Sequence, residues 1–544
     1  MSLYRQPHSR GGYYAHFSVA ASGGSSMNLA NLGQELLGEM AADSSGVFSP
    51  SIYETARLVA LAPDFSGHEG RVRFLLDEQD PAGHWGGPDE YALLPTLSAT
   101  EALLAELART RAPHVARAVH RGLHDLFARS VPGKEVPLPD TVAVELLVPS
   151  LIGEINARLA TLETTPLPGL DFWRDGRRLP CPSGCHTELL AAMRAAAAAG
   201  QALPEKLGHS LEMLGSAARG AAFLRPGEFG AGCSPAATAA WFGNRATNGN
   251  RHPALRFLET VQARHGGPVP VAAPLDVFER AWVLAAFTDV GLPVTIAPGI
   301  ARGLRAAFRE SGVAGGAGLP TDADDTATAL HALANVGMPQ PLDPLWEYRA
   351  GDHFSTYPDE RTPSVTTNAH VLQAFAAQPG TGAREAKAMR TLSHWISAQQ
   401  NEDGSWSDKW HASPYYATVC CFTALSGYAD GIAAARKAVR WVLATQREDG
   451  SWGRWQGTAE ETAYAVQILL RAGDPGAVDA AARGCAFLLD AHGPHPPLWH
   501  DKDLYTPGRI VRAETIAALH LAGTKPRVSA LLARARAGQS RRTA

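Results

Sequence analysis

One short pattern recurs along this chain and limits its fold more than any other feature of the sequence. The pattern reads Gln, any three residues, Gly, any one residue, Trp, and it occurs at residues 79–85 (QDPAGHW), 400–406 (QNEDGSW) and 446–452 (QREDGSW). Residues 223–229 (FLRPGEF) are a variant that ends in Phe. Repetition with fixed internal spacing is typical of stacked supersecondary units. The chain is therefore expected to build its core from repeated units.

The segments that flank these turns have a helical pattern. KAVRWVLATQ precedes the last turn and TAEETAYAVQILLRAG follows it, with apolar residues three or four positions apart. Helical hairpins repeated around a closed ring form an α/α barrel. Copies near both ends of the chain therefore predict an all-α fold with two α/α barrels. Each Gln-Trp turn is interpreted as a structural staple between helices, outside any active site.

Length and composition exclude several classes of protein. A chain of 544 residues favours more than one domain. The formal charge of −4, without a cluster of Lys and Arg, predicts no nucleic-acid partner. The sequence contains no run of about 18 uncharged apolar residues, so no transmembrane helix is expected. The first residues lack the apolar core of a signal peptide, and six cysteines are too few for a disulfide framework, so a cytoplasmic location is expected. Cys181, Cys185 and His186 lack a second pair at zinc-ligand spacing, which disfavours zinc.

Three carboxylates fall within four positions at Asp322, Asp324 and Asp325, in the stretch LPTDADDTATALHALANVG. One interpretation is helix capping, with Thr321 as the N-cap residue and Asp324 at the third helical position. The other is acid chemistry, because like charges and burial raise a carboxyl pKa above the ~3.9 of free Asp. If the flanking carboxylates stay ionised, Asp324 in the middle can hold a proton and act as a Brønsted acid.

Aromatic residues in the second half of the chain could line a cavity suited to carbocations, because the faces of aromatic rings attract cations. They are Trp346, Tyr348, Phe354, Tyr357, Trp410, Tyr415, Tyr416, Tyr464, Trp499 and Tyr505.

These features resemble those of the class II terpene cyclases. The family signature DxDDTA stands at residues 322–327, and Gln-Trp turns mark the same superfamily. SIYETARLVA, HSLEMLGSAARGAAFLRPGEFGAGCSPAATAA and PLDVFERAWVL resemble segments of copalyl diphosphate synthases. SVTTNAHVLQAF, DKWHASPYYAT and PLWHDKDLYTPGRIVRAE resemble the bacterial, free-standing branch.

The resemblance implies two α/α-barrel domains, called β and γ in this family. The β domain would be built from residues 1–46 and 271–544, the γ domain from residues 47–270, and the active site would lie between them. It implies an intramolecular lyase or isomerase in which Asp324 protonates the distal double bond of a linear isoprenoid diphosphate. Geranylgeranyl diphosphate is the expected substrate and a bicyclic copalyl-type diphosphate the expected product. The diphosphate would be retained, and the product passed to a separate class I synthase or tailoring enzyme.

Further roles are implied residue by residue. Asn368, in TTNAH, matches the Asn that hydrogen-bonds the catalytic Asp, although it could also be a buried amide that ties two helices. Asp140 and Glu145, in DTVAVE, resemble the bacterial pair that binds Mg²⁺ with the diphosphate, although they could also be solvated acids. The further substrate-binding candidates are Lys502 and Arg512 for the diphosphate, and Trp346, Tyr415, His411 and Tyr505 for the chain, with His411 and Tyr415 also considered for the terminating base.

Four alternatives stay open. A class I synthase is disfavoured because Asp324 and Asp325 are followed by TATALHA, which does not complete DDxxD. A squalene-type cyclase is disfavoured because its hydrocarbon substrate needs no metal-binding carboxylates. A sesquiterpene cyclase of the drimenyl type, acting on farnesyl diphosphate, would share these motifs. A non-catalytic toroid that binds a prenyl chain or a protein partner remains possible because fold does not fix function.

Overall fold

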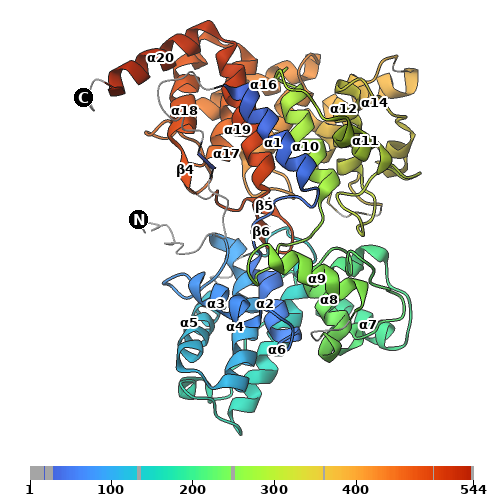
Figure 1. Ribbon diagram of the computed structural model, residues 1–544, viewed down its shortest axis with the longest axis vertical. Coiled ribbons are helices and arrows are strands. Elements are labelled where there is room, and N and C mark those ends of the chain that lie inside the picture. The colour runs from blue at the N-terminus through green and yellow to red at the C-terminus, as the bar shows by residue number, and fades with distance from the viewer. Residues whose placement is uncertain are drawn as a thin grey trace.

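The computed structural model describes residues 17–18, 28–131, 137–246, 251–358, 360, 362–380, 382–493 and 495–540. Within these residues the chain is mostly helical and forms two helical bodies, one above the other in Figure 1. The expected all-α fold is confirmed.

The upper body in Figure 1 is a closed ring of inner helices, each packed on the next and the last on the first. The inner helices are α10 (Asp276–Thr288), α12 (Ala323–Asn335), α13 (Val365–Ala377), α15 (Pro414–Ala424), α17 (Ala459–Ala472) and α19 (Gly508–Gly523). The outer helices are α1 (Leu29–Ala42), α11 (Pro298–Ala306), α14 (Ala383–Ala398), α16 (Ala429–Ala444), α18 (Val478–Asp490) and α20 (Pro526–Ser540). Helix α1 packs on α19, and its Leu36, Leu37 and Met40 join the same core.

The lower body repeats the design on a smaller ring with a separate core. Its inner elements are α2 (Ile52–Leu61), α4 (Leu93–Thr110), α6 (Val144–Leu162), the 3-10 segment η3 (Glu205–Ala218) and α8 (Pro235–Phe242). Its outer helices are α3 (His68–Asp77), α5 (Pro113–Arg129), α7 (Thr187–Ala198) and α9 (Pro253–Ala263).

Short elements connect the helices. The further 3-10 segments are η1 (Asp89–Ala92), η2 (Asp171–Trp173), η4 (Gly243–Arg245), η5 (Asp343–Tyr348) and η6 (Pro475–Ala477). The described strands form antiparallel pairs: β1 (Phe17–Ser18) with β4 (His492–Gly493), β2 (Arg349–Ala350) with β3 (His353–Phe354), and β5 (Trp499–His500) with β6 (Leu504–Tyr505). The β5–β6 hairpin lies where the two bodies meet (Figure 1).

The Gln-Trp turns make the same hydrogen bonds at each copy. Gln400 Nε2 donates to the carbonyls of Gly404 and Ala434, each at 2.9 Å, and Trp406 Nε1 donates to the carbonyl of Ile396 at 2.9 Å. Gln79 and Gln446, and Trp85 and Trp452, donate in the same pattern. Each turn thus fastens its own helix to the next outer helix, as the sequence predicts.

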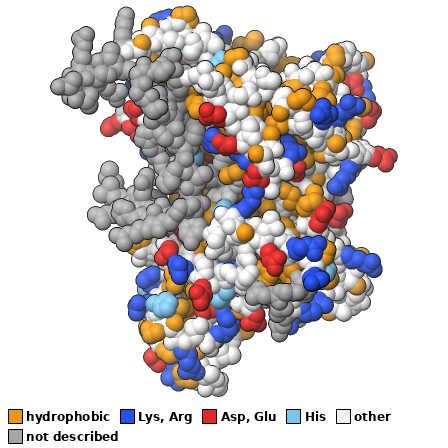
Figure 2. Space-filling model, viewed as in Figure 1, with side chains coloured by type: hydrophobic (Ala, Val, Ile, Leu, Met, Phe, Trp, Pro, Cys, Tyr) orange, Lys and Arg blue, Asp and Glu red, His pale blue; other side chains and the backbone are white. Residues whose placement is uncertain are grey.

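Lys and Arg side chains are interspersed with Asp, Glu and apolar side chains over the coloured part of the face in Figure 2. Across the described residues, none of the helices is both long and apolar enough to cross a membrane.

The role of the Gln-Trp turns as staples can be tested by measuring the free energy of unfolding of a variant. Trp406 is fully buried, so Trp406→Ala leaves a cavity and removes the bond to Ile396. We expect a loss of about 3–5 kcal/mol in the free energy of unfolding, measured by urea denaturation followed by circular dichroism. Phe172→Ala, at a side chain that is 57% exposed, is the control. A variant as stable as the wild type would contradict the role of the staple.

Candidate active site

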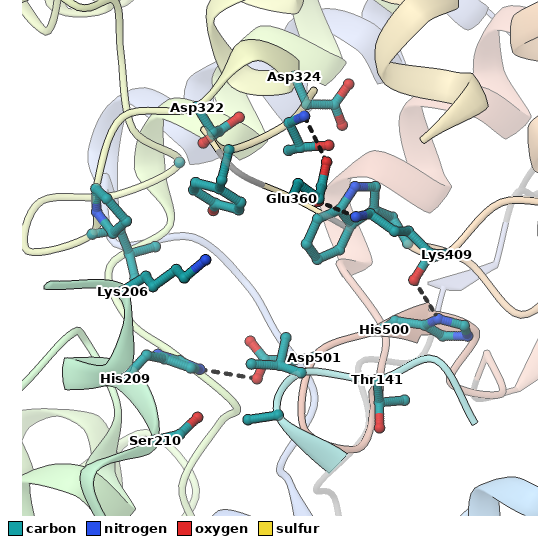
Figure 3. A pocket seen from close by; sticks show the side chains of 18 of the residues that line it. Thr141, Lys206, His209, Ser210, Asp322, Asp324, Glu360, Lys409, His500 and Asp501 are labelled. Carbon is teal, nitrogen blue, oxygen red and sulfur yellow. Dashed lines mark hydrogen bonds and ion pairs between the residues drawn. The ribbon is translucent and has the colours of Figure 1, made fainter. Parts of the chain in front are cut away.

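A cavity of about 420 Å³ lies where the two bodies meet. The lower body contributes residues 140–143, 145–146, 206–207 and 209–210. The upper body contributes residues from α10, the start of α12 and the β5–β6 hairpin, together with Thr356, Tyr357, Glu360 and Thr362. Figure 3 shows Asp322 and Asp324 on one side of this space and Lys206, His209 and Thr141 on the other. Its size lies within the usual range for small-molecule sites.

The acidic turn begins helix α12. Asp322, rather than Thr321, is the N-cap residue, and its Oδ1 accepts a hydrogen bond from the backbone N–H of Asp325 at 2.8 Å. The Thr321 hydroxyl instead bonds that of Ser311 at 2.9 Å, so the expected capping by Thr321 is wrong. A capping carboxyl and a cavity-lining carboxyl are here the same residue.

Burial changes the proton affinity of the flanking carboxyls. Burial and the charge of Asp325 raise the pKa of Asp322 well above its usual value. Burial raises the pKa of Asp325 to about 7, against the opposing effect of its hydrogen bond to Asp322. Both pKa values are raised, which works against the condition of two ionised neighbours under which Asp324 was expected to hold its proton.

Asp324 contacts a histidine. His370, on α13, places Nδ1 2.7 Å from Oδ1 of Asp324, and both side chains are largely buried. Asn368 does not make the expected bond to Asp324. Its amide donates to the carbonyls of Phe354 and Ser364 at 2.9 and 2.7 Å and accepts from the Phe354 N–H at 2.8 Å. Asn368 is thus a fully used buried amide, and His370 is the partner of Asp324.

Aromatic side chains form the wall between the two ends of the cavity. The Phe278 ring lies 4.6 Å from that of Trp282 and 5.4 Å from that of Trp499, between centroids. The full set that lines the cavity is Phe278, Trp282, Tyr357, Trp410, Trp499 and Tyr505. Four residues were expected to contact the isoprenoid chain of the substrate, and of these Tyr505 is part of this wall. Ring faces of this kind stabilise a nearby cation by about 0.5–2 kcal/mol each.

Asp140 and Glu145 both line the lower end of the cavity. Between them lies a tight turn in which Ala143 has a φ of 53°, a left-handed conformation that non-glycine residues rarely adopt. The turn is also held to the hairpin, because Val142 donates its N–H to the carbonyl of Asp501 at 3.0 Å. Two carboxylates at this spacing are suitable oxygen ligands for Mg²⁺, which needs one or two and keeps several waters.

Cationic side chains also face this end. Lys206 extends its ammonium group into the cavity in Figure 3. His209 lies at the kink of η3, with Nδ1 2.6 Å from the carbonyl of Gly232 and Nε2 3.0 Å from Asp501. Burial acts to lower the pKa of His209, but the charge of Asp501 raises it overall. Since both partners accept hydrogen bonds, His209 is a protonated imidazolium paired with Asp501.

Lys409 lies across the cavity from this pair. It is bound to Glu360 in an ion pair, and it donates to the carbonyl of Thr362 at 2.8 Å. Its own backbone carbonyl accepts from His500 at 2.7 Å (Figure 3). The motif analysis did not identify Lys206, His209, His370 or Lys409. Signals for the two histidines were present in the sequence, since His209 opens the HSLE segment and His370 closes TTNAH.

The expected roles of Lys502 and Arg512 are wrong. Lys502 is 1% exposed, and its ammonium lies 2.6 Å from Glu54, 2.8 Å from Glu212 and 2.8 Å from the hydroxyl of Ser234, inside the lower body. Arg512 lies on α19 and pairs with Glu39 of α1, at 2.6 and 3.1 Å. Both cations are bound to carboxylates away from the cavity.

The three other residues expected to contact the isoprenoid chain do not line the cavity. Trp346 stacks on Phe375 at 5.3 Å, beneath the guanidinium of Arg384. Tyr415 packs on Trp441 of the outer helix α16, at 4.5 Å between ring centroids. His411 is buried behind Trp499 and donates from Nε2 to Glu460 at 3.1 Å. Each of them packs in the wall or core of the upper body instead of lining the cavity.

Comparison with known proteins identifies the family. The family model for the squalene-hopene cyclase C-terminal domain matches residues 355–511. The ent-copalyl diphosphate synthase of Streptomyces sp. (strain KO-3988) is 46% identical over 89% of this chain and 94% of its own length. The labda-7,13-dienyl diphosphate synthase of Streptomyces clavuligerus is 44% identical over 89% and 91%. The solved structure of ent-copalyl diphosphate synthase from Streptomyces platensis, 44% identical, superimposes with a TM-score of 0.86 over 91% of this chain and 99% of that one.

The chain belongs to the class II terpene cyclases, and it is an enzyme of that class. Within the class, it groups with the bacterial diterpenoid diphosphate cyclases represented by these relatives.

The raised pKa of Asp325 predicts a pH-dependent stability. The folded state holds this proton to about pH 7, whereas an unfolded chain releases it near pH ~4. Between these values the folded state binds more protons, so stability falls as the pH rises, by at most about 1.4 kcal/mol per pH unit. Asp325→Asn removes this dependence, so the variant should gain in melting temperature relative to the wild type from pH 4 to 7. Glu188→Gln, an exposed carboxyl on α7, is the control. If the melting temperatures of Asp325→Asn and the wild type change with pH in parallel, Asp325 does not hold a buried proton.

Proposed function

We propose that this enzyme converts geranylgeranyl diphosphate to a bicyclic copalyl-type diphosphate by protonation, with the diphosphate retained. The observation that carries the proposal is the order of groups along one cavity. Buried carboxyls lie at one end, aromatic rings line the middle, and carboxylates and cations lie at the other end. The names of relatives at 43–46% identity, which include copalyl diphosphate synthases, support the same substrate and product class.

In the proposed mechanism Asp324 gives its proton to the distal double bond of the bound chain. His370 orients Asp324, and the neutral member of the Asp322–Asp325 pair reduces the negative charge beside it. The rings of Phe278, Trp282 and Trp499 then stabilise the cation while the two rings close. Loss of a proton from the final cation ends the reaction.

We propose that the diphosphate is held at the lower end of the cavity. Asp140 and Glu145 would hold Mg²⁺, which would supply positive charge to the diphosphate oxygens. Lys206 would contact the same oxygens directly, and the His209–Asp501 pair would border them. Because the diphosphate stays on the product, a separate class I synthase or tailoring enzyme would use it, and we propose that both steps take place in the cytoplasm.

The assignment of Asp324 can be tested by incubating the purified enzyme with geranylgeranyl or farnesyl diphosphate and Mg²⁺. Products are dephosphorylated and analysed by mass spectrometry. We expect a bicyclic alcohol from the C20 substrate, and a loss of at least about a hundredfold in kcat for Asp324→Ala and Asp324→Asn. Asp352→Asn, at a side chain that is 68% exposed, is the control. A cyclic product from farnesyl diphosphate would shift the substrate to C15. Equal activity in the Asp324 variants would contradict the proposed acid.

The diphosphate end has its own test. Asp140→Ala, Glu145→Ala and Lys206→Ala should each raise KM by about tenfold, the effect of one charge-assisted contact, with a smaller change in kcat. In the two carboxylate variants the Mg²⁺ concentration for half-maximal rate should rise as well, and a chelator should abolish wild-type activity. Lys437→Ala, at an exposed residue of α16, is the control. Unchanged KM and Mg²⁺ dependence would contradict this location of the diphosphate.

A further inference from the structure

A second cavity of about 80 Å³ lies inside the ring of inner helices of the upper body. It borders His370 of the Asp324–His370 pair. Its lining comes from α10, α12, α13, α15, α17 and α19. The proposed mechanism assigns no step to this space.

The lining of the second cavity includes several buried polar groups. Gln467 donates to Glu514 at 2.6 Å, and His331 lies 2.7 Å from Asp289. Within the described part of the chain, two further lining atoms, Thr328 Oγ1 and Arg471 Nε, are buried without a hydrogen-bond partner. Buried polar atoms of this kind are normally satisfied by ordered water, which needs only about 10–15 Å³ per molecule in such a cavity. The space is therefore suited to hold water.

Trp282 separates the two cavities. Of the residues described, it is the one side chain that lines both of them. Its indole N–H donates to the hydroxyl of Tyr416 at 3.0 Å, and its ring meets the His370 ring edge-to-face at 5.4 Å. On the reaction side it packs on Phe278. The ring is thus fixed on both sides as a wall between the second cavity, which has buried polar atoms in its lining, and the reaction cavity.

We propose that Trp282 decides how the cyclisation ends, by keeping water of the second cavity away from the carbocation. The inference rests on the proposed function. Without the wall, an oxygen lone pair of water would form a C–O bond to the cationic carbon, and the resulting oxonium would lose a proton to solvent. The product would then keep its diphosphate and gain one hydroxyl, whereas the wild-type cation loses a proton and becomes an alkene.

The test compares products of Trp282→Ala and Trp282→Leu with those of the wild type, from geranylgeranyl diphosphate in water enriched in oxygen-18. We expect the hydroxylated fraction of the bicyclic product to rise at least tenfold, with the new oxygen drawn from the labelled water. Tyr505→Ala is the matched control, because Tyr505 lines the first cavity and packs on Phe48, away from the second cavity. It should slow the reaction without adding hydroxylated product.

A filling variant tests the source of the water. Ala286 lines the second cavity, so Trp282→Ala/Ala286→Leu should lower the hydroxylated fraction again. The proposal is overturned if the Trp282 variants make the wild-type alkene alone, if Tyr505→Ala hydroxylates equally, or if the filling variant has no effect. It is also overturned if both folded Trp282 variants lose all turnover, since a wall against water is not needed for protonation. Absence of cyclic diphosphate from the wild type would instead refute the proposed function.

Discussion

A buried ammonium group holds the two helical bodies together. Lys502, in the turn between β5 and β6 of the upper body, reaches into the lower body and is bound there by Glu54, Glu212 and Ser234. The neighbouring carboxylates raise the pKa of Lys502 despite its burial, so the charge is retained. Breaking such a pair by removal of one partner typically costs 3–5 kcal/mol. The active cavity depends on this contact because the same hairpin carries Trp499, Asp501 and Tyr505 into it.

The cavity separates two opposite electrostatic tasks. At the acidic end, burial raises the pKa of Asp322 and Asp325, which lowers the negative charge beside Asp324, the proposed proton donor. At the lower end, cations and the two carboxylates proposed to hold Mg²⁺ suit a group with several negative charges. The aromatic wall between them consists of Phe, Trp and Tyr rings, whose faces stabilise a cation. One chain can therefore protonate a hydrocarbon at one end while it leaves a diphosphate intact at the other.

The sequence predicted the parts of this arrangement that are local. The Gln-Trp staples, the acidic turn and the pair Asp140 and Glu145 are each contained within a few residues, and the structure places them as staples, helix start and cavity lining. Errors arose where the direction of a side chain matters. Asn368 and His370 are two positions apart on α13, about 200° around the helix, so just one of them faces Asp324. Likewise Asp501 faces the cavity while the adjacent Lys502 faces the lower core. Such choices depend on the packing of distant helices, which a single sequence does not specify.

The central claim is that the reaction begins with a proton and leaves the diphosphate on the product. The most direct measurement is to run the wild-type reaction with geranylgeranyl diphosphate in deuterium oxide and follow it by phosphorus NMR and mass spectrometry. Our account predicts one deuterium in each bicyclic product, on the ring methylene next to the first carbon that becomes cationic, and phosphorus signals of an intact diphosphate ester. Release of inorganic diphosphate, with no deuterium in the hydrocarbon skeleton, would contradict it.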